Sequence, residues 1–490
     1  MNKKQALRLA LACPLALGPC PSAFALPVSA VASPFFRSVV MGGAPHAHPP
    51  VAIPVRETTI TDPAGKVTTT EYDDGGRPVK VTDAKGQETT YTYDETGRVT
   101  VLGYPDGTGY GMAYDRAGLL TSFTDPLGKV HDYAYDASGG RTSETDAEGK
   151  LWGYAYDKNG RLKTITDPLG KSAAYAYDDN DNIVSHTGPS GALNAYSYDA
   201  NNRLIEHTDP LGNIEKLTYD GLGNVLSTED PEHGLTSFVY DAANRITLIT
   251  DALTKTRSFE YNKTDQLTLA IDELGKSTQY AYDTAGRLDT VTDPLGGVRS
   301  YLYDLFGRRK SEKDALNREV VYTYDDLGRL DAVTDPTGTR SYAYDSSGRL
   351  SAETSVDNKI TRFAYDAGNR MTSRTEPDGS ITRFEYDGSG NRTKVTDAQG
   401  NATGFFYDAT NRLVRTVAPD GGTTRFEYDA SGNQTAITDA SGARTSFVYD
   451  KLNRLTAQTA PDGAVTAFEY DSLGNQKKIT DSAGKITSFV

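Results

Sequence analysis

The chain has 490 residues, of which 37% are hydrophobic and 24% charged, and 66 acidic side chains outnumber 51 basic ones, giving a formal net charge of −15. This balance argues against nucleic acid as a partner, because phosphate backbones are bound by surfaces with an excess of Lys and Arg. The low hydrophobic content predicts a thin core, whereas 47 Gly and 31 Tyr beside a single Trp indicate a repetitive chain that folds.

Residues 1–25 resemble a secretory signal peptide. Three cations in the first eight residues precede an Ala/Leu-rich run, and Ala23-Phe24-Ala25 places small residues where a signal peptidase cleaves. Cys13 and Cys20 raise a lipoprotein as the alternative, although neither follows a good lipidation box. Export predicts a secreted or cell-surface protein whose mature chain has no thiol. No other segment approaches the roughly 20 apolar residues of a membrane span.

Residues 26–56 are rich in proline and are predicted to form an exposed leader. The leader contains His46 and His48, whose His-Ala-His spacing could hold a metal weakly. A solvated linker is the simpler interpretation, and it is the one we adopt.

Residues 57–490 follow one pattern, in which a registered Tyr, nearly always followed by Asp, recurs twenty times from Tyr72 to Tyr470. Every step is 21 residues long except one of 20, from Tyr324 to Tyr344. A fixed period over this length predicts about twenty copies of one supersecondary unit, each of which buries its apolar face against its neighbours.

Two turn signals divide each copy. The residue four positions after the registered Tyr, such as Gly160, is Gly in thirteen copies, Asn in five and Asp in two. Only these residues tolerate a left-handed backbone well, so this first turn is predicted to be a tight hairpin turn. The second turn has the form Asp167-Pro168-Leu169-Gly170, which suits a type I turn.

The residues between the turns alternate with a period of two and are rich in Thr, Val, Ile, Tyr and Phe, so each copy is predicted to be a β-hairpin. The residue two before the registered Tyr is aromatic in seventeen copies, and it shares a face of the sheet with that Tyr. We expect these rings to form ladders that supply much of the core.

Arg follows the left-handed position in twelve copies and Asn in five. We expect these side chains to pair with the Asp after each registered Tyr, as a ladder that stabilises the turns. A phosphate-binding stripe is the alternative, and the matching row of Asp argues against it.

Twenty hairpins predict an all-β fold of about forty antiparallel strands, which as a flat ribbon would be about 190 Å wide. Strand twist prevents so wide a sheet from staying flat, so the ribbon should wind into a spiral or a hollow wall. In the 20-residue step Gly338 lies one residue closer to its Tyr, which predicts the loss of a bulge and a local change of curvature.

The sequence Tyr-Asp-x-x-Gly-Arg-Leu followed by Thr-Asp-Pro-x-Gly, as in residues 156–170 and 282–296, resembles the RHS or YD-repeat family across residues 57–490. The resemblance implies hairpins wound into a large hollow shell. In bacteria such shells often enclose a C-terminal toxin used against competing cells or hosts, and animal relatives act in cell adhesion. Because residues 487–490 match the strand before a further registered Tyr, we expect the repeats to be truncated here, and no family core or toxin residue can be carried over.

The sequence predicts no catalytic, cofactor-binding or metal-binding residues, and any toxin enzyme would lie beyond residue 490. His186 and His207 are 21 residues apart and could form a metal pair, but ordinary variation within the repeat is favoured, since two ligands make a poor site. The Asp-rich turns could bind Ca²⁺, with solvated turn caps as the default.

Two functions remain open at this stage. One is a non-enzymatic shell segment with a C-terminal toxin as cargo. The other is a surface adhesin or carbohydrate-binding protein whose partner is a cell-surface glycan or protein.

Overall fold

The computed structural model describes residues 56–62 and 65–489. These residues form 42 strands and no helix, and each strand pairs antiparallel with the next along the chain. The predicted all-β hairpin ribbon is therefore confirmed. The predicted signal peptide and the leader with its two His lie outside the described residues, apart from Arg56, which begins the first strand instead of ending the leader.

The strands have the following bounds: β1 Arg56–Thr61, β2 Val67–Tyr72, β3 Pro78–Thr82, β4 Glu88–Tyr93, β5 Val99–Gly103, β6 Gly109–Tyr114, β7 Leu120–Thr124, β8 Val130–Tyr135, β9 Arg141–Thr145, β10 Leu151–Tyr156, β11 Leu162–Thr166, β12 Ser172–Tyr177, β13 Ile183–Thr187, β14 Leu193–Tyr198, β15 Leu204–Thr208, β16 Ile214–Tyr219, β17 Val225–Glu229, β18 Leu235–Tyr240, β19 Ile246–Thr250, β20 Thr256–Tyr261, β21 Leu267–Ile271, β22 Ser277–Tyr282, β23 Leu288–Thr292, β24 Val298–Tyr303, β25 Arg309–Lys313, β26 Glu319–Tyr324, β27 Leu330–Asp335, β28 Gly338–Tyr344, β29 Leu350–Thr354, β30 Ile360–Tyr365, β31 Met371–Thr375, β32 Ile381–Tyr386, β33 Arg392–Thr396, β34 Ala402–Tyr407, β35 Leu413–Val417, β36 Thr423–Tyr428, β37 Gln434–Thr438, β38 Arg444–Tyr449, β39 Leu455–Thr459, β40 Val465–Tyr470, β41 Gln476–Thr480 and β42 Ile486–Ser488.

The two turns of each repeat share one backbone design. In the turns other than the shortened one, the carbonyl of the opening residue, which is most often Asp, accepts a hydrogen bond from the N–H of the fourth residue, as Asp157 does from Gly160 at 3.0 Å and Asp167 from Gly170 at 2.9 Å. The fourth residue has a positive φ in all twenty first turns, as predicted. The fourth residue of the second turns also has a positive φ, for example 75° at Gly170. These loops are therefore type I turns followed by a left-handed bulge residue.

The 20-residue step shortens one second turn. Pro336 and Thr337 alone connect β27 to β28, and Asp335 pairs directly with Gly338. The left-handed residue that other second turns insert is therefore missing, which confirms the predicted loss of a bulge. The associated change of curvature stays a prediction.

The core is thin, as predicted. Among the described hydrophobic residues, only Leu102, Leu217, Tyr301 and Ala436 are buried, and Leu102 and Tyr301 still keep 8% of their surface exposed. The ring two before the registered Tyr does not face another ring in most repeats. In nine of the seventeen repeats with such a ring it faces an aliphatic side chain across the strand pair, as Phe468 faces Ile479, which is a favourable cross-strand combination. In the other eight it faces a polar or charged side chain, as Tyr301 faces Glu312, so the rings do not form a continuous aromatic ladder.

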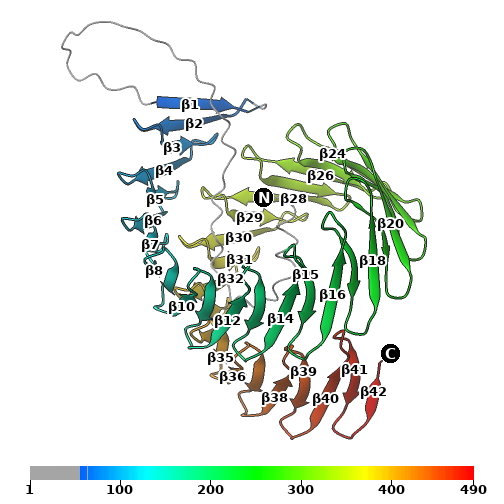
Figure 1. Cartoon of the computed structure of the whole chain (residues 1–490). Coiled ribbons are helices and arrows are strands. Elements are labelled where there is room, and N and C mark those ends of the chain that lie inside the picture. Colours follow the sequence, from blue (N-terminus) through cyan, green and yellow to red (C-terminus); the bar gives the residue numbers. More distant parts are fainter. Residues whose placement is uncertain (1–55, 63–64, 490) are drawn as a thin grey trace, which may run out of the picture.

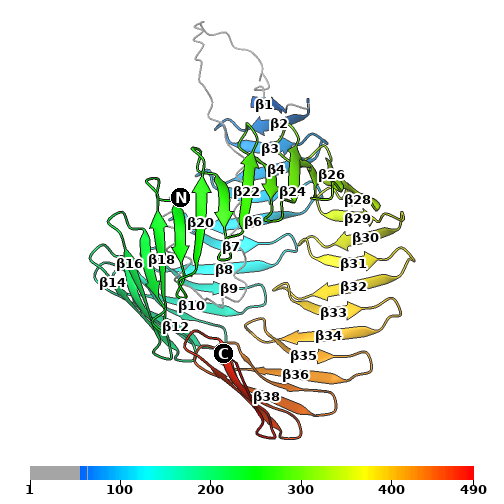
Figure 2. The same cartoon turned by 90° about the vertical axis from the view of Figure 1, so that its right-hand side faces the viewer.

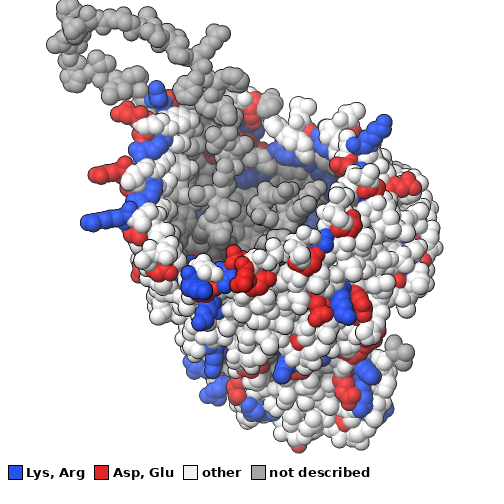
Figure 3. All heavy atoms as spheres, in the orientation of Figure 1, with Lys and Arg blue, Asp and Glu red and all other residues white. Residues whose placement is uncertain are grey.

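The ribbon winds on itself in a spiral (Figures 1 and 2). Contacts recur between residues 240 or 241 positions apart, such as Glu232 with Ser472 (2.8 Å) and Ser190 with Ser431 (2.7 Å). One revolution therefore takes 23 strands, as from β8 to β30. In the space-filling view the wall is hollowed on the face shown, and charges of both signs are mixed over that face (Figure 3). The predicted spiral or hollow wall is confirmed.

These contacts define a seam, in which second turns of the first revolution meet first turns of the next, and Figure 2 shows the two rows of turns facing each other. The pairs are 83–86 with 325–328, 104–107 with 345–348, 125–128 with 366–369, 146–149 with 387–390, 188–191 with 429–432 and 230–233 with 471–474.

Gly368 packs against Leu127 of the facing revolution and gives a position at which the seam can be tested. A Cβ atom at Gly368 would lie 2.9 Å from Cδ1 and 3.3 Å from Cγ of Leu127, so the branched side chain of valine fits only if Leu127 or the facing revolution moves. We expect Gly368→Val to increase the radius of gyration measured by small-angle X-ray scattering while the circular dichroism of the hairpins is retained. Gly160→Asn, at an open left-handed turn, is the matched control. An unchanged radius for Gly368→Val would contradict the seam.

Candidate functional site

The most regular polar feature of the wall is a ladder of Asp, Arg and Tyr along the first turns. Asp241 shows how it begins: its Oδ1 accepts the backbone N–H of Ala243 at 2.9 Å and of Arg245 at 3.0 Å. Its Oδ2 accepts Nε and Nη2 of Arg245 at 2.8 and 2.5 Å. All twelve copies with Arg at this position have the Nε bond, at 2.6–2.8 Å, so the predicted Asp–Arg pairing is confirmed.

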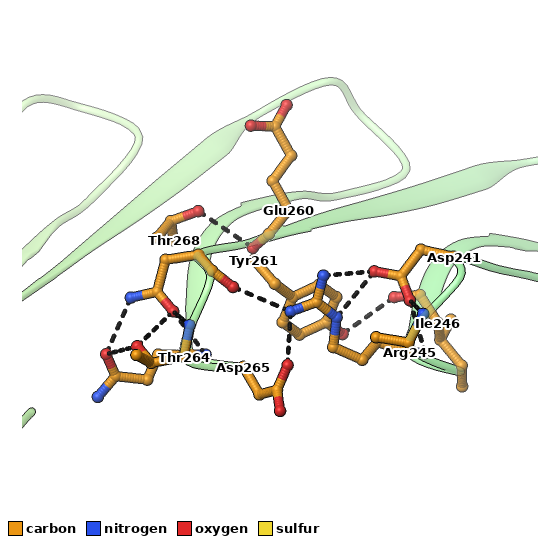
Figure 4. A network of polar contacts seen from close by, with 11 residues as sticks. Asp241, Arg245, Ile246, Glu260, Tyr261, Thr264, Asp265 and Thr268 are labelled. Atoms are coloured by element: carbon orange, nitrogen blue, oxygen red, sulfur yellow. Dashed lines mark hydrogen bonds and ion pairs between the residues drawn. The ribbon is translucent and has the colours of Figure 1, made fainter.

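The same Arg also joins one repeat to the next (Figure 4). Nη1 of Arg245 donates to the carbonyl of Asn262 at 3.0 Å and to Oδ1 of Asp265 at 2.9 Å. Its guanidinium lies 4.8 Å from the ring centre of Tyr261, a cation–π contact that recurs in all twelve copies with Arg at 4.4–5.2 Å. Sequence reasoning missed this connection between repeats.

The hydroxyl of the registered Tyr completes the ladder. Tyr261 donates its O–H to the carbonyl of Ile246 at 2.9 Å, and the equivalent bond is present in the nineteen copies from Tyr93 to Tyr470. The signal was available in the sequence. The registered position is always Tyr, whereas the position two before it takes Tyr or Phe interchangeably.

The seven copies without Gly at the left-handed position are explained by the same ladder. Their Asn or Asp side chain accepts a hydrogen bond from the previous repeat, as Asn202 does from Asn182 at 2.9 Å. The other acceptors are Asp181, Asn244, Asp265, Asn369, Asn411 and Asn453. Asn and Asp tolerate the left-handed backbone conformation at these positions, and their side chains add a hydrogen bond between repeats.

The ladder shifts the pKa values of its members. Hydrogen bonds from the side chain and then the backbone of Arg245 lower the pKa of Asp241, and those of Arg203 do the same for Asp199. Burial raises the pKa of Tyr219, whose hydroxyl is held by a carbonyl. At neutral pH the ladder is therefore a row of ion pairs with neutral phenols between them.

The two predicted metal candidates lie on one face of alternate strands, and each stacks on a tyrosine. The ring centres of His186 and Tyr175 are 4.9 Å apart, and those of His207 and Tyr196 are 5.0 Å apart. Burial lowers the pKa of His186. Across residues 56–62 and 65–489 there is no cluster of three or more His, Cys, Asp or Glu that could hold a metal ion. The turn aspartates are engaged as backbone caps, which is the default predicted for them.

Comparison with protein families agrees with this geometry. The family model described as RHS Repeat matches residues 56–88, 76–108, 114–151, 156–193, 177–214, 344–381, 365–402, 407–444 and 449–486, more than half of the chain. The chain belongs to the RHS-repeat family. The model described as Teneurin YD-shell matches residues 216–361 of this RHS-repeat chain.

Solved structures show the same fold. The crystal structure of TcdB2-TccC3 is 14% identical, with a TM-score of 0.54 over 88% of this chain and 32% of that one. The Tc holotoxin pore of Photorhabdus luminescens is 17% identical, with a TM-score of 0.48 over 89% of this chain and 26% of that one. The RHS-repeat chain thus spans a third or less of these structures. No curated protein sequence matches it. Within the described part of the chain, no helix is long and apolar enough to cross a membrane.

The tyrosine hydroxyl gives a direct test of the ladder. We expect Tyr219→Phe to lower the free energy of unfolding by about 1 kcal/mol, because it removes the 2.6 Å bond to the carbonyl of Leu204 while keeping the ring. Tyr280→Phe, at a position where repeats exchange Tyr and Phe, should change stability little. Urea denaturation followed by circular dichroism measures both, and equal effects would refute a special role for the registered hydroxyl.

Stability should also depend on acid. Because turn carboxylates such as Asp73, Asp199 and Asp241 have folded pKa values below their ordinary value of 3.8, the folded chain binds fewer protons than the unfolded chain at these groups. Their contribution is fully present above about pH 4 and is lost as the pH falls through the folded pKa values. We expect urea midpoints to fall steeply below about pH 4. Asp199→Asn should weaken the protein at neutral pH and flatten this dependence, and a pH-independent midpoint would contradict the ladder.

Proposed function

We propose that this RHS-repeat chain is a non-enzymatic length of shell wall that encloses a C-terminal toxin and takes part in its delivery to competing bacteria or host cells. The observation that carries the proposal is the seam, by which one ribbon closes on itself after 23 strands and forms a hollowed wall. Membership of the RHS-repeat family supports a structural shell role. The Tc holotoxin structure named above is a toxin assembly by its title.

The circumference of one revolution affects the size of the cargo that the wall could enclose. At about 4.8 Å per strand, 23 strands give a ring roughly 35 Å across, and strand tilt can only widen it. Side chains on the inner face reduce the free width to roughly 25 Å. A compact domain of about 100 residues has a radius of gyration of about 13 Å and would fill or exceed this space. Without strand tilt the wall would therefore hold an extended or partly unfolded chain, and a folded domain of this size would need the wider ring that tilt gives.

The polar groups of the wall support a structural role. Asp, Arg and Tyr of the ladder bind one another and the turn backbones, and His186 and His207 stack on tyrosine rings, so these groups hold the wall together. We propose that export depends on the signal peptide of residues 1–25, which would place the shell outside the cell.

The test is protection of a cargo. The complete reading frame that contains this chain is expressed, and the domain that follows the repeats is exposed to a protease before and after unfolding of the wall. We expect protection in the wild type and rapid cleavage in Gly368→Val, which opens the seam, while Gly160→Asn protects as the wild type does. The isolated following domain should be toxic when expressed inside bacteria.

Two results would refute the proposal. One is cleavage of the following domain at the same rate in the wild type and in Gly368→Val. The other is a following segment that anchors the protein to a cell surface, together with binding of the purified repeats to a glycan array, which would favour an adhesin.

A further inference from the structure

A row of arginines crosses the strands of the second revolution. The position three before the registered Tyr is Arg in three of the twenty copies, and all three lie within four consecutive repeats, as Arg362, Arg383 and Arg425. In the other copies this position is most often Ser, Thr, Ala or Gly. The three side chains are exposed, on β30, β32 and β36. Because they occupy one position of the repeat, they project from one face of the sheet.

The third of these four repeats supplies its arginine from a neighbouring strand. Its equivalent residue is Gly404 on β34, and the ring of Phe406 lies over it, since a Cβ atom at Gly404 would be 3.4 Å from Cε2 of that ring. The guanidinium of Arg415, on β35, lies 3.7 Å from the centre of the same ring. The ring therefore holds a guanidinium beside the place where this repeat has no side chain. We call Arg362, Arg383, Arg415 and Arg425 the arginine row.

The arginine row has no acidic partner within the part of the chain that the structure describes, where none of its four guanidiniums makes a hydrogen bond or an ion pair. Two glutamates project from the same face, each two residues after an arginine of the row. Both are paired elsewhere, Glu385 with Lys394 at 2.9 Å and Glu427 with Arg444 at 2.9 Å.

Two members of the row also repel each other. Arg415 and Arg425 are directly opposite on the paired strands β35 and β36, and like charges at such positions destabilise a sheet. The chain has a net charge of −15, so carboxylates are plentiful elsewhere in it. Four arginines that are kept together without one indicate an anionic ligand, because a guanidinium binds a carboxylate through two parallel hydrogen bonds.

The spacing of the row indicates which anion fits. Equivalent residues of consecutive repeats lie two strands apart, which is about 9.6 Å. A polyproline II helix has three residues per turn and rises about 3.1 Å per residue, so side chains three residues apart lie on one side, about 9.3 Å from each other. A segment with an acidic residue at every third position would therefore present one carboxylate to each arginine in turn.

Two other polyanions fit the row less well. The phosphates of one nucleic-acid strand recur about every 3.4 Å, nearly three times as densely as the arginines. A lipid surface is flat on this scale, whereas the row from β30 to β36 spans six of the 23 strand intervals of one revolution. Its arginines thus lie along an arc of about a quarter of the ring, which a flexible chain can follow and a bilayer cannot.

We propose that the arginine row is an interaction surface for an acidic peptide segment of a partner protein, bound in the polyproline II conformation with a carboxylate at every third residue. Each guanidinium takes one carboxylate, and Phe406 fixes the position of Arg415. Because these pairs form in contact with water, the binding is moderate in affinity and weakens as salt is added.

The test uses the purified chain and a fluorescein-labelled peptide of four Asp-Pro-Pro units, whose binding is measured by fluorescence anisotropy. We expect this peptide to bind at least about fivefold more tightly than a peptide of the same composition with its four Asp consecutive. The dissociation constant should rise about tenfold or more when the row is replaced, by Arg362→Gln, Arg383→Gln, Arg415→Gln and Arg425→Gln together. It should stay within about twofold in a control that removes four exposed cations elsewhere, by Lys163→Gln, Arg299→Gln, Lys310→Gln and Lys477→Gln together.

A second variant separates geometry from charge. Phe406→Ala keeps every charge of the row but removes the ring on which Arg415 lies. We expect it to weaken binding of the Asp-Pro-Pro peptide about threefold while the circular dichroism of the sheet is retained.

Several results would overturn the proposal. They are no binding of the Asp-Pro-Pro peptide, equal binding of the two peptides, equal losses in the arginine-row variant and its control, and a Phe406→Ala protein that binds as the wild type does. Stronger competition by alginate or single-stranded DNA than by the unlabelled peptide would assign the row to a polysaccharide or a nucleic acid instead. Displacement of the peptide by phosphatidylglycerol vesicles would assign it to a membrane. None of these outcomes depends on a toxin, so the shell function is tested separately.

Discussion

The wall depends on the aspartate that opens most of its turns. In most first turns, as at Asp241, one carboxylate oxygen accepts backbone N–H groups of the turn and so fixes the hairpin, while the other holds an arginine or asparagine that reaches the next repeat. A single side chain thereby couples local backbone conformation to the stacking of repeats. Because so few side chains of the sheet are buried, hydrophobic burial alone does little to fix the position of one hairpin on the next. The hydrogen bonds and ion pairs of the aspartate fix that position instead.

The arginine adds a second kind of coupling. The guanidinium of Arg245 lies over the ring of Tyr261 in the following repeat. The hydroxyl of Tyr261 donates a hydrogen bond to the carbonyl of Ile246 on the preceding strand. Each repeat is thus held to the next by an ion pair, a ring face and a hydrogen bond in one cluster. Where Asn replaces Arg, as at Asn182, the cluster is smaller, and the Asn at the left-handed position of the next repeat accepts the available donor. The two substitutions compensate each other within one contact.

Much of the fold could be predicted from the sequence because it is local. The 21-residue period, the left-handed residue of the first turn and the alternation of the strands each depend on a few adjacent residues. The Asp–Arg pairing was predictable for the same reason, since the partners are four residues apart. The contact of Arg245 with Tyr261 was not predicted, because it depends on which strands are neighbours and on which face of the sheet the arginine of the turn lies. The contacts of the seam were still harder to predict from the sequence. A partner 240 residues away is fixed by the summed twist of 23 strands, and no single residue encodes it.

The odd number of strands in one revolution has a consequence for how such walls can change length. Turns alternate between the two edges of the ribbon, so an odd count brings a turn of one edge directly opposite a turn of the other, whereas an even count would place it opposite a gap. Duplicating or deleting an entire hairpin changes the count by two and keeps the parity. Genes for such chains can therefore lengthen or shorten by unequal crossing-over in units of one hairpin, because the turns of successive revolutions stay opposite one another. Gain or loss of a single strand would instead place every later turn opposite a gap.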